Sequence, residues 1–338
     1  MLKITKSIIA IIFAVSVGLG MFVFVFSEKK TFSENENKNL AKFPEFTLKS
    51  LESGDFTADL EEYMKDHFPL RDPLMKLKTK AQLAAGYKRI GDVHIGKDRL
   101  FQQVDKPDVS SFVASSNKLF SAIENKDITT SVILLPSASE IYENELPSYT
   151  EHIDEKTVIN DILSQIDCDN AIDPTDMLLE KKAENNLFYT TDHHWTTYGA
   201  YLAYVELMEA WGMEAQPLDA FTVETVSNEF YGTAWRNAGM KWITPDEIEY
   251  YRFDGDEDYT MTINDNGTVF EGFYDRSYLD VTDQYSSFIS GNNAYVTIEK
   301  NGVEDRERLL LVKDSFGHSL APFLAYHFDL EIVDLRYY

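Results

Sequence analysis

The chain has 338 residues, of which 44% are hydrophobic and 13% aromatic, and this excludes a wholly disordered protein, which needs low hydrophobicity together with high charge. Lys and Arg number 31 against 57 Asp and Glu, a net charge of −26 that repels phosphate backbones, so we expect no nucleic-acid partner. The single cysteine, Cys168, excludes an internal disulfide, a Cys-x-x-Cys redox pair and a thiolate zinc cluster within one chain.

The N-terminal segment 7–26 carries no charged residue. At about 1.5 Å per residue a helix over this stretch spans about 30 Å, the thickness of the hydrocarbon core of a membrane. The apolar part of a cleavable secretory signal has only roughly 7–15 residues, so we expect an uncleaved single-pass anchor. Residues 1–6 then form a cytoplasmic head, and the bulk of the chain lies outside the cell. A cleaved signal is the alternative, because residues 25–27 offer an acceptable cleavage site.

Residues 27–90 are predicted to form a stalk and a helical lead-in. The first part, 28–50, is rich in Lys, Asn and Glu and shows no hydrophobic periodicity. Two helices are expected after it, over about 53–63 and 72–86, separated by Pro69. The larger domain follows.

Alternating strands and helices dominate residues 91–338. Two short strands on either side of the turn 96–99 open this domain. Longer elements follow, with strands expected at 131–135, 171–173 and 308–313 and helices at about 109–125, 155–166, 175–183 and 197–211. The alternation predicts an α/β fold with a parallel sheet flanked by helices.

Two segments depart from this alternation. Residues 244–300 contain β-rich runs and an Asn-Gly turn at 266–267, so we expect a β-hairpin insertion there. The alternating run 330–333 has no further segment to cover it, so we expect a strand with an exposed edge.

Asp192 and His194 stand between a strand-like run and a long helix. A carboxylate two residues before an imidazole can hold the ring through its Nδ1–H, fix the tautomer and stabilise the imidazolium formed in proton transfer. This predicts Asp192 as the residue that orients the ring and His194 as the general base. A capping carboxylate and a surface histidine are the structural alternative. His193 is expected to point elsewhere and is an alternative base.

Ser315 comes shortly after the apolar strand 308–313 and stands at the start of a helix. Backbone N–H groups and the helix dipole favour a developing oxyanion at such a place, so the position suits a nucleophile. A serine there is also an ordinary helix N-cap, and that interpretation stays open. His318, in the next turn, is a further alternative base.

The run Asp-His-His-Trp at 192–195 resembles the signature of the DHHW family of cell-surface proteins, which is similar to the alginate O-acetylation proteins of the SGNH hydrolase-like superfamily. The resemblance covers most of the chain from about residue 60, through the runs 66–72, 96–101 and 313–316. It implies an SGNH hydrolase-like fold and a triad of Ser315, His194 and Asp192. In this order Asp and His precede Ser, as in the alginate proteins and unlike typical SGNH esterases.

The resemblance also implies a function. It points to a membrane-anchored O-acetyltransferase or acetylesterase that forms an acyl-serine and acts on cell-surface polysaccharide. Alginate-type systems deliver acetyl groups through a membrane protein, so a membrane acetyl-donor protein is an expected partner, and we expect no cofactor. A non-catalytic SGNH-like domain that only binds polysaccharide is the alternative.

Aromatic and basic side chains near these motifs are candidates for holding the substrate. Trp195, Tyr198 and Trp235 offer faces on which a sugar ring can stack. Arg236 ends the aromatic run 230–236, which is a candidate cleft lining. Packing in the core explains the same residues equally well.

A metal centre is a separate hypothesis. The residues with suitable ligand types are Asp192, His193, His194 and His318. Adjacent histidines do not converge easily on one ion, and the sequence has no His-Glu-x-x-His spacing, so we expect no metal.

Overall fold

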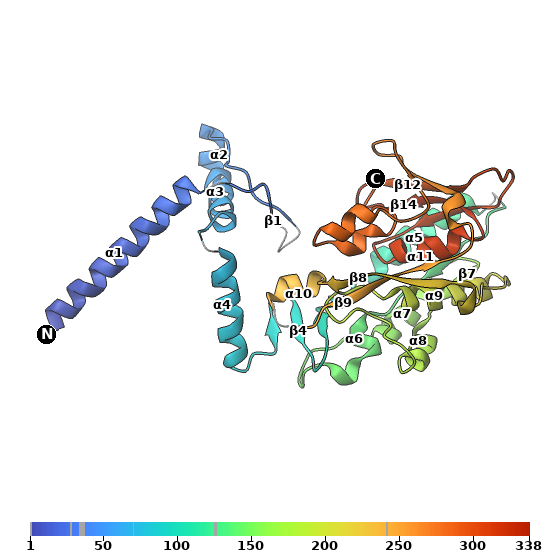
Figure 1. The fold of residues 1–338 in the computed structure, drawn as a ribbon, viewed down its shortest axis with the longest axis horizontal. Helices are drawn as coiled ribbons and strands as arrows, with labels where there is room; N and C mark the ends of the chain where they lie inside the picture. The colour runs from blue at the N-terminus through green and yellow to red at the C-terminus, as the bar shows by residue number, and fades with distance from the viewer. Residues whose placement is uncertain (1, 28, 34–37, 70, 125–126, 241–242) are drawn as a thin grey trace. The chain divides into compact units, whose positions relative to one another are not determined.

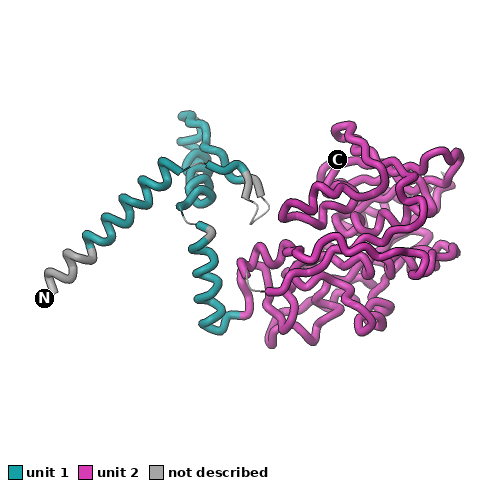
Figure 2. Tube along the Cα trace, in the orientation of Figure 1, with its two compact units in different colours: residues 1–87 teal, residues 88–338 magenta. Residues whose placement is uncertain are grey.

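The computed structural model describes most of the chain, in the ranges 2–27, 29–33, 38–69, 71–124, 127–240 and 243–338. Residues 1–87 and 88–338 form two compact units (Figure 2). The first unit contains the predicted anchor, and the second contains every residue predicted for the site.

The first unit consists of helices and a short hairpin (Figure 1). Its elements are α1 (Leu2–Phe26), the antiparallel strands β1 (Phe32–Ser33) and β2 (Lys38–Asn39), and the helices α2 (Leu48–Ser53), α3 (Asp55–Asp66) and α4 (Arg71–Ala84). Thr47 caps α2 by accepting the Ser50 N–H at 3.0 Å. The helices expected on either side of Pro69 are present as α3 and α4.

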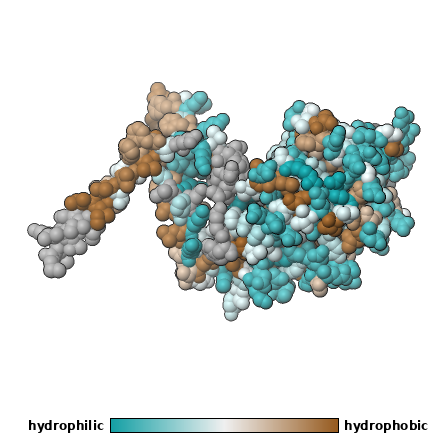
Figure 3. Space-filling view, viewed as in Figure 1, coloured by the Kyte–Doolittle hydropathy of each residue, from teal (hydrophilic) through white to brown (hydrophobic). Residues whose placement is uncertain are grey.

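Helix α1 contains the segment 7–26 that the sequence predicts to be a membrane anchor. Its described side chains include Ile11, Phe13 and Phe22, each more than half exposed, and Figure 3 shows apolar groups along this helix. Within the described residues, however, no helix combines the length and apolar character that a membrane crossing demands. The predicted span therefore has no support from the structure.

A five-stranded sheet is the centre of the second unit. Its strands lie in the order β11 (Thr268–Glu271), β10 (Tyr259–Ile263), β12 (Tyr295–Lys300), β14 (Asp329–Val333) and β13 (Arg308–Val312). The strands β13 and β14 are parallel, with Leu309 opposite Leu330, and the other pairs are antiparallel. Alternate residues of β10 and β12 are buried, as expected for strands with one face against a core.

Helices α9 (Thr197–Ala210) and α11 (Gly317–Ala325) share the main hydrophobic core with this sheet. Tyr204 of α9 and Phe323 of α11 stack with ring centroids 5.6 Å apart. Ile298 and Leu330 of the sheet belong to the same core. Because α11 follows β13 after a short turn, this packing fixes the turn that carries Ser315.

Smaller elements complete the second unit. The strands β3 (Arg89–Ile90), β4 (Val93–Ile95) and β5 (Leu100–Gln102) are antiparallel, β6 (Ser131–Ile133) and β7 (Asn170–Ile172) are parallel, and β8 (Thr222–Phe230) pairs antiparallel with β9 (Asp246–Arg252). The remaining α-helices are α5 (Val109–Ile123), α6 (Ala138–Ile141), α7 (Glu155–Leu163), α8 (Thr175–Lys181) and α10 (Thr233–Ala238). The hairpin expected around the turn 96–99 is present between β4 and β5.

The main sheet was predicted to be parallel, but it is mixed. Among its described strands β13 and β14 form the parallel pair. The hairpin expected at the Asn-Gly turn 266–267 is present between β10 and β11. Residues 244–300 are nevertheless no insertion beside the main sheet, since β10 and β12 are interior strands. The run 330–333 lies in β14, which is paired on both sides, so the expected exposed edge is wrong. An alternating strand has the same sequence pattern in a hairpin insertion, at an edge or inside an antiparallel sheet, so the pattern did not distinguish these places.

Candidate active site

The segment that carries Asp192 and His194 forms a tight loop ahead of α9. The Tyr189 N–H donates to the His194 carbonyl at 3.1 Å and closes the loop. Thr196 caps α9 by accepting the Gly199 N–H at 3.2 Å. The loop is therefore closed by a backbone hydrogen bond and followed by a side-chain cap, and its side chains have defined directions.

Ser315 meets this loop from the turn between β13 and α11. Its Oγ lies 2.7 Å from Nε2 of His194, and Nδ1 of His194 lies 2.5 Å from Oδ1 of Asp192. Asp192 is 2% exposed and His194 7% exposed, while Ser315 is half-buried. A ring that donates from Nδ1 to a carboxylate keeps its Nε2 lone pair for the serine hydroxyl. The structure thus brings together the three residues that the sequence predicts as a triad.

Asp192 is held through its second carboxylate oxygen by the start of α10. The Thr233 N–H donates to Oδ2 at 2.6 Å, and Gly232 lies so close that a Cβ there would overlap the carboxylate. Burial opposes ionisation of Asp192. The charges of His193 and His194 and the hydrogen bonds to the carboxylate outweigh burial, so the pKa of Asp192 lies well below its ordinary value. The carboxylate is therefore charged and able to stabilise an imidazolium.

Asp246, at the start of β9, is a residue that the sequence did not point to. Its carboxylate accepts the N–H and hydroxyl of Thr190, at 2.9 and 2.7 Å, and those of Thr191, at 2.8 and 2.6 Å. These two threonines directly precede Asp192, so Asp246 fixes the backbone that carries it. The adjacent threonines were the one signal in the sequence, because buried donors need an acceptor. They do not identify which carboxylate is that acceptor.

Tyr285, in the 3-10 helix η5 (Gln284–Ser287), is a second such residue. Its hydroxyl donates to the Ser315 carbonyl at 3.2 Å, and its ring stacks on His194 with centroids 3.9 Å apart. Burial raises the pKa of Tyr285 above its ordinary value, so the phenol keeps its proton. Tyr285 thus contacts both the predicted base and the predicted nucleophile.

Trp195 occupies a different place from the one predicted for it. Its side chain is 1% exposed, so it cannot offer a stacking face to a sugar. The indole N–H lies 3.1 Å from the Phe316 carbonyl and 2.9 Å from Oγ of Ser319. Trp195 therefore holds the turn that carries Ser315.

The other residues predicted to contact substrate, Tyr198, Trp235 and Arg236, are also largely buried. Trp235 packs at a tilt against Tyr231 with ring centroids 4.3 Å apart. Arg236 donates to Oγ1 of Thr233 at 2.8 Å and so braces the start of α10. Of the three, Tyr198 lines a pocket.

The alternative bases do not share the described hydrogen bond to Ser315. The His193 ring packs at a tilt against His194 with ring centroids 3.9 Å apart, and its pKa is lowered to about 4 by burial and by the charge of His194. His318 is 1% exposed, and burial together with the charge of Lys313 holds its pKa well below the ordinary value. His194 is therefore the histidine positioned to take the serine proton.

Ligand atoms of Asp192, His193 and His194 lie within 4.8 Å of one another, a spacing that suits a metal ion. Both ring nitrogens of His194, however, already have hydrogen-bond partners in Asp192 and Ser315. A metal bound by His194 would have to replace one of these contacts. The arrangement as it stands suits proton transfer.

The backbone after Ser315 was expected to donate to an oxyanion. The Phe316 N–H donates to Oδ1 of Asp314 at 2.9 Å, and the N–H groups of Gly317 and His318 donate to the carbonyls of Asp314 and Ser315, each at 3.2 Å. These three donors are used within the turn, while the role expected of the Ser315 N–H itself in holding an oxyanion stays a prediction. An oxyanion here requires donors other than these three.

The fold and the site together define an α/β protein with a hydrogen-bonded Ser-His-Asp arrangement. The chain belongs to the DHHW protein family, whose family model matches residues 110–333. This agrees with the resemblance seen in the sequence. No curated protein matches the chain.

Solved structures share this fold. A DHHW family protein from Eubacterium siraeum is 22% identical, with a TM-score of 0.57 over 73% of this chain and 82% of that one. Bacillus cereus PatB1 with a sulfonyl adduct is 20% identical, with a TM-score of 0.61 over 75% of this chain and 88% of that one. The O-acetyltransferase domain of Pseudomonas putida AlgJ is a weaker likeness, 16% identical with a TM-score of 0.45 over 72% and 79% of the two chains.

Proposed function

We propose that the chain is an O-acetyltransferase or acetylesterase that acts on cell-surface polysaccharide through an acetyl-serine. The observation that carries the proposal is the 2.7 Å contact between Oγ of Ser315 and Nε2 of His194, with Asp192 on the other ring nitrogen. A serine hydroxyl is a weak nucleophile until a base within hydrogen-bond reach activates it.

In the first half-reaction, Oγ of Ser315 attacks the carbonyl carbon of an acetyl donor while Nε2 of His194 takes the hydroxyl proton. The bond from the acetyl carbon to the donor's leaving oxygen then breaks, and that oxygen takes the proton from His194. Asp192 stabilises the imidazolium between these two transfers. The products are acetyl-Ser315 and the deacetylated donor.

In the second half-reaction, an acceptor hydroxyl gives its proton to His194 and attacks the acetyl carbon. The Oγ–carbon bond breaks, and Ser315 takes the proton back from His194. A sugar hydroxyl as acceptor yields an O-acetylated glycan, whereas water yields acetate. Exclusion of water therefore decides between a transferase and an esterase.

Covalent labelling of Ser315 tests the proposal. PatB1, a structural neighbour, is described with a sulfonyl adduct, which makes a sulfonyl fluoride a suitable probe. We expect labelling of the wild type, none in Ser315→Ala, and a rate lowered at least about 100-fold in His194→Ala. Ser164→Ala is the control, because the Ser164 hydroxyl is exposed and donates to the Asp161 carbonyl at 2.9 Å. A folded protein whose Ser315 does not react favours the polysaccharide-binding alternative.

Acetyl transfer and hydrolysis are separated with a chromogenic acetyl ester, supplied with and without an oligosaccharide acceptor. Acetylated oligosaccharide as the main product identifies a transferase, and free acetate in both reactions identifies an esterase. A wild type that releases no chromophore in either reaction contradicts both activities.

The proposal includes export of the second unit to the cell surface and acetyl groups supplied by a membrane acetyl-donor protein. The apolar segment 7–26 supports export, because such a segment at the N-terminus is typical of exported chains. Protease added to intact cells should digest the second unit. A chain protected until the cells are lysed contradicts the surface location.

A further inference from the structure

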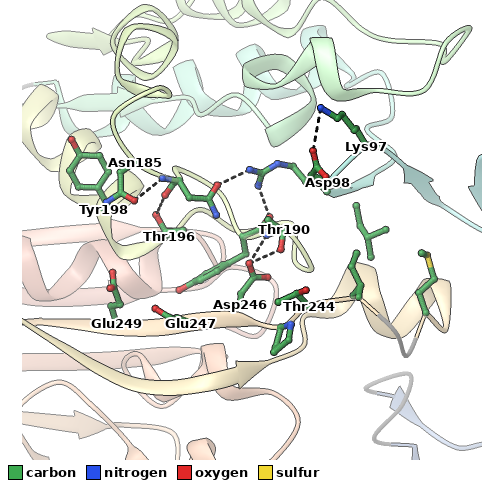
Figure 4. Close-up of a pocket in the computed structure, with 18 of the residues that line it drawn as sticks. Lys97, Asp98, Asn185, Thr190, Thr196, Tyr198, Thr244, Asp246, Glu247 and Glu249 are labelled. Atoms are coloured by element: carbon green, nitrogen blue, oxygen red, sulfur yellow. Dashed lines mark hydrogen bonds and ion pairs between the residues drawn. The ribbon is translucent and has the colours of Figure 1, made fainter.

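A pocket of about 760 Å³ lies beside the loop 190–196 (Figure 4). Its walls come from the turn 96–99, from Asn185 and Asn186, and from the start of β9. The described residues that line it do not include Ser315 or His194, so it is separate from the candidate active site. Its volume falls within the range of about 300–1,000 Å³ that is typical of ligand pockets.

Most charged groups around this pocket are already paired. The Arg99 guanidinium donates to Oδ1 of Asn186 at 2.6 Å and to two backbone carbonyls. Asp246 accepts the four threonine hydrogen bonds, and Lys97 lies 3.8 Å from Asp98. These groups are therefore engaged by the protein itself.

Two carboxylates remain, those of Glu247 and Glu249. They are two residues apart on β9 and so share one face of the strand, and Figure 4 shows both among the residues that line the pocket. Burial and the charge of Glu247 raise the pKa of Glu249. Among the described residues no cation forms an ion pair with either carboxylate. A cationic ligand would relieve their mutual repulsion.

Neutral groups in the same pocket suit a carbohydrate. The amide of Asn185, the hydroxyl of Thr244 and the ring of Tyr198 line it (Figure 4). Amides and hydroxyls exchange hydrogen bonds with sugar hydroxyls, and an aromatic side chain packs against the apolar face of a sugar ring. A glycan that carries carboxylates or phosphates would be repelled by Glu247 and Glu249.

We infer that this pocket binds a segment of the acceptor glycan that carries free amino groups, with an ammonium group held by Glu247 and Glu249. The inference rests on the proposed function only in taking the ligand to be the acceptor, because binding itself does not require Ser315. A polymer held at a second point has a higher local concentration at the acetyl-serine.

The probe is a hexamer of glucosamine, compared with the N-acetylated hexamer by titration calorimetry of the full chain in low salt. At about pH 6 the sugar amines are charged, and we expect the glucosamine hexamer to bind about tenfold more tightly than the N-acetylated one. Added salt should weaken that preference. The double variant Glu247→Gln/Glu249→Gln should lose it, while Glu257→Gln/Glu304→Gln, which removes two exposed carboxylates elsewhere, should keep it.

Equal affinity for the two hexamers, or an unchanged preference in Glu247→Gln/Glu249→Gln, overturns the inference. Sulfonyl fluoride labelling of Ser315 in the same samples separates it from the proposed function. A double variant that is labelled normally but has lost the preference supports the glycan pocket. A wild type that shows the preference but is never labelled contradicts the acetyl-serine mechanism and still supports glycan binding in this pocket.

Discussion

The two segments that meet in the site are held in different ways. The loop before α9 depends on buried polar groups, since Asp246 accepts four hydrogen bonds from it and α10 donates to Asp192. The turn that carries Ser315 is held by two aromatic side chains, Trp195 and Tyr285. A buried carboxylate that loses its hydrogen-bond donors costs more than a neutral group that loses one hydrogen bond. Changes around the loop should therefore harm the site more than changes around the turn.

The largest effect is expected from Gly232→Ala. The new Cβ overlaps Asp192, so the carboxylate must move and the imidazole loses its alignment. We expect labelling of Ser315 by a sulfonyl fluoride to slow at least about 100-fold. Gly20→Ala is the control, because a Cβ there meets no atom within 4 Å. A normal labelling rate in Gly232→Ala contradicts the role given to this contact.

Asp246→Asn should come next. An amide keeps one acceptor oxygen but turns donors toward the N–H and hydroxyl of a threonine, so two hydrogen bonds are lost. We expect the free energy of unfolding to fall by about 2–3 kcal/mol and labelling to slow about tenfold. Asp254→Asn, at an exposed position of the same region, should change neither. Identical behaviour of the two variants in denaturant titrations and labelling contradicts the comparison.

A smaller effect is expected from Trp195→Phe, which removes the indole donor from the turn. The Ser319 hydroxyl and the Phe316 carbonyl lose a partner, so labelling should slow about fivefold and the free energy of unfolding should fall by about 1–2 kcal/mol. Trp211→Phe is matched in chemistry, since the Trp211 indole donates to Ser131 at 2.8 Å, away from the site. If both variants slow labelling equally, the turn does not depend on Trp195 in particular.

The smallest effect on the site is expected from Lys313→Met. This variant removes a buried ammonium group that lies 3.5 Å from Asp334. Burial lowers the pKa of Lys313 from 10.5 to about 8, so between these values the unfolded chain binds more protons than the folded one. The free energy of unfolding should therefore rise with pH in this window, by about 1–2 kcal/mol more in the wild type than in Lys313→Met. Urea titrations at pH values from about 7 to 11 measure this difference. Parallel curves for the two proteins contradict it.

The sequence predicts the local parts of this molecule well. The hairpin around 96–99 and the helix over 197–210 follow from turn residues and apolar runs, and both are present. The mixed order of the main sheet does not follow, because an alternating strand does not specify its neighbour. Strand β14 lies between β12 and β13 through pairings with residues distant in the chain.

Some residues of the candidate site could likewise be predicted from local sequence patterns, and others could not. Asp192 and His194 form a short motif, and Ser315 stands at a strand-to-helix turn, so all three could be picked out from local patterns. Asp246 contacts Thr191 across 55 positions, and Tyr285 contacts the Ser315 carbonyl across 30. Both contact groups far away in the chain, so no local pattern of residues identifies Asp246 or Tyr285 as their partner.

The placement of β14 has a consequence for biosynthesis. The ribosome makes β12 and β13 before β14, yet β14 separates them in the finished sheet. A nascent chain that has emerged only as far as Ser315 therefore lacks the strand on which the turn and α11 are assembled. Because β13 pairs with β14 in the described sheet, we expect the contact between Ser315 and His194 to form only once residues 329–333 are available for pairing.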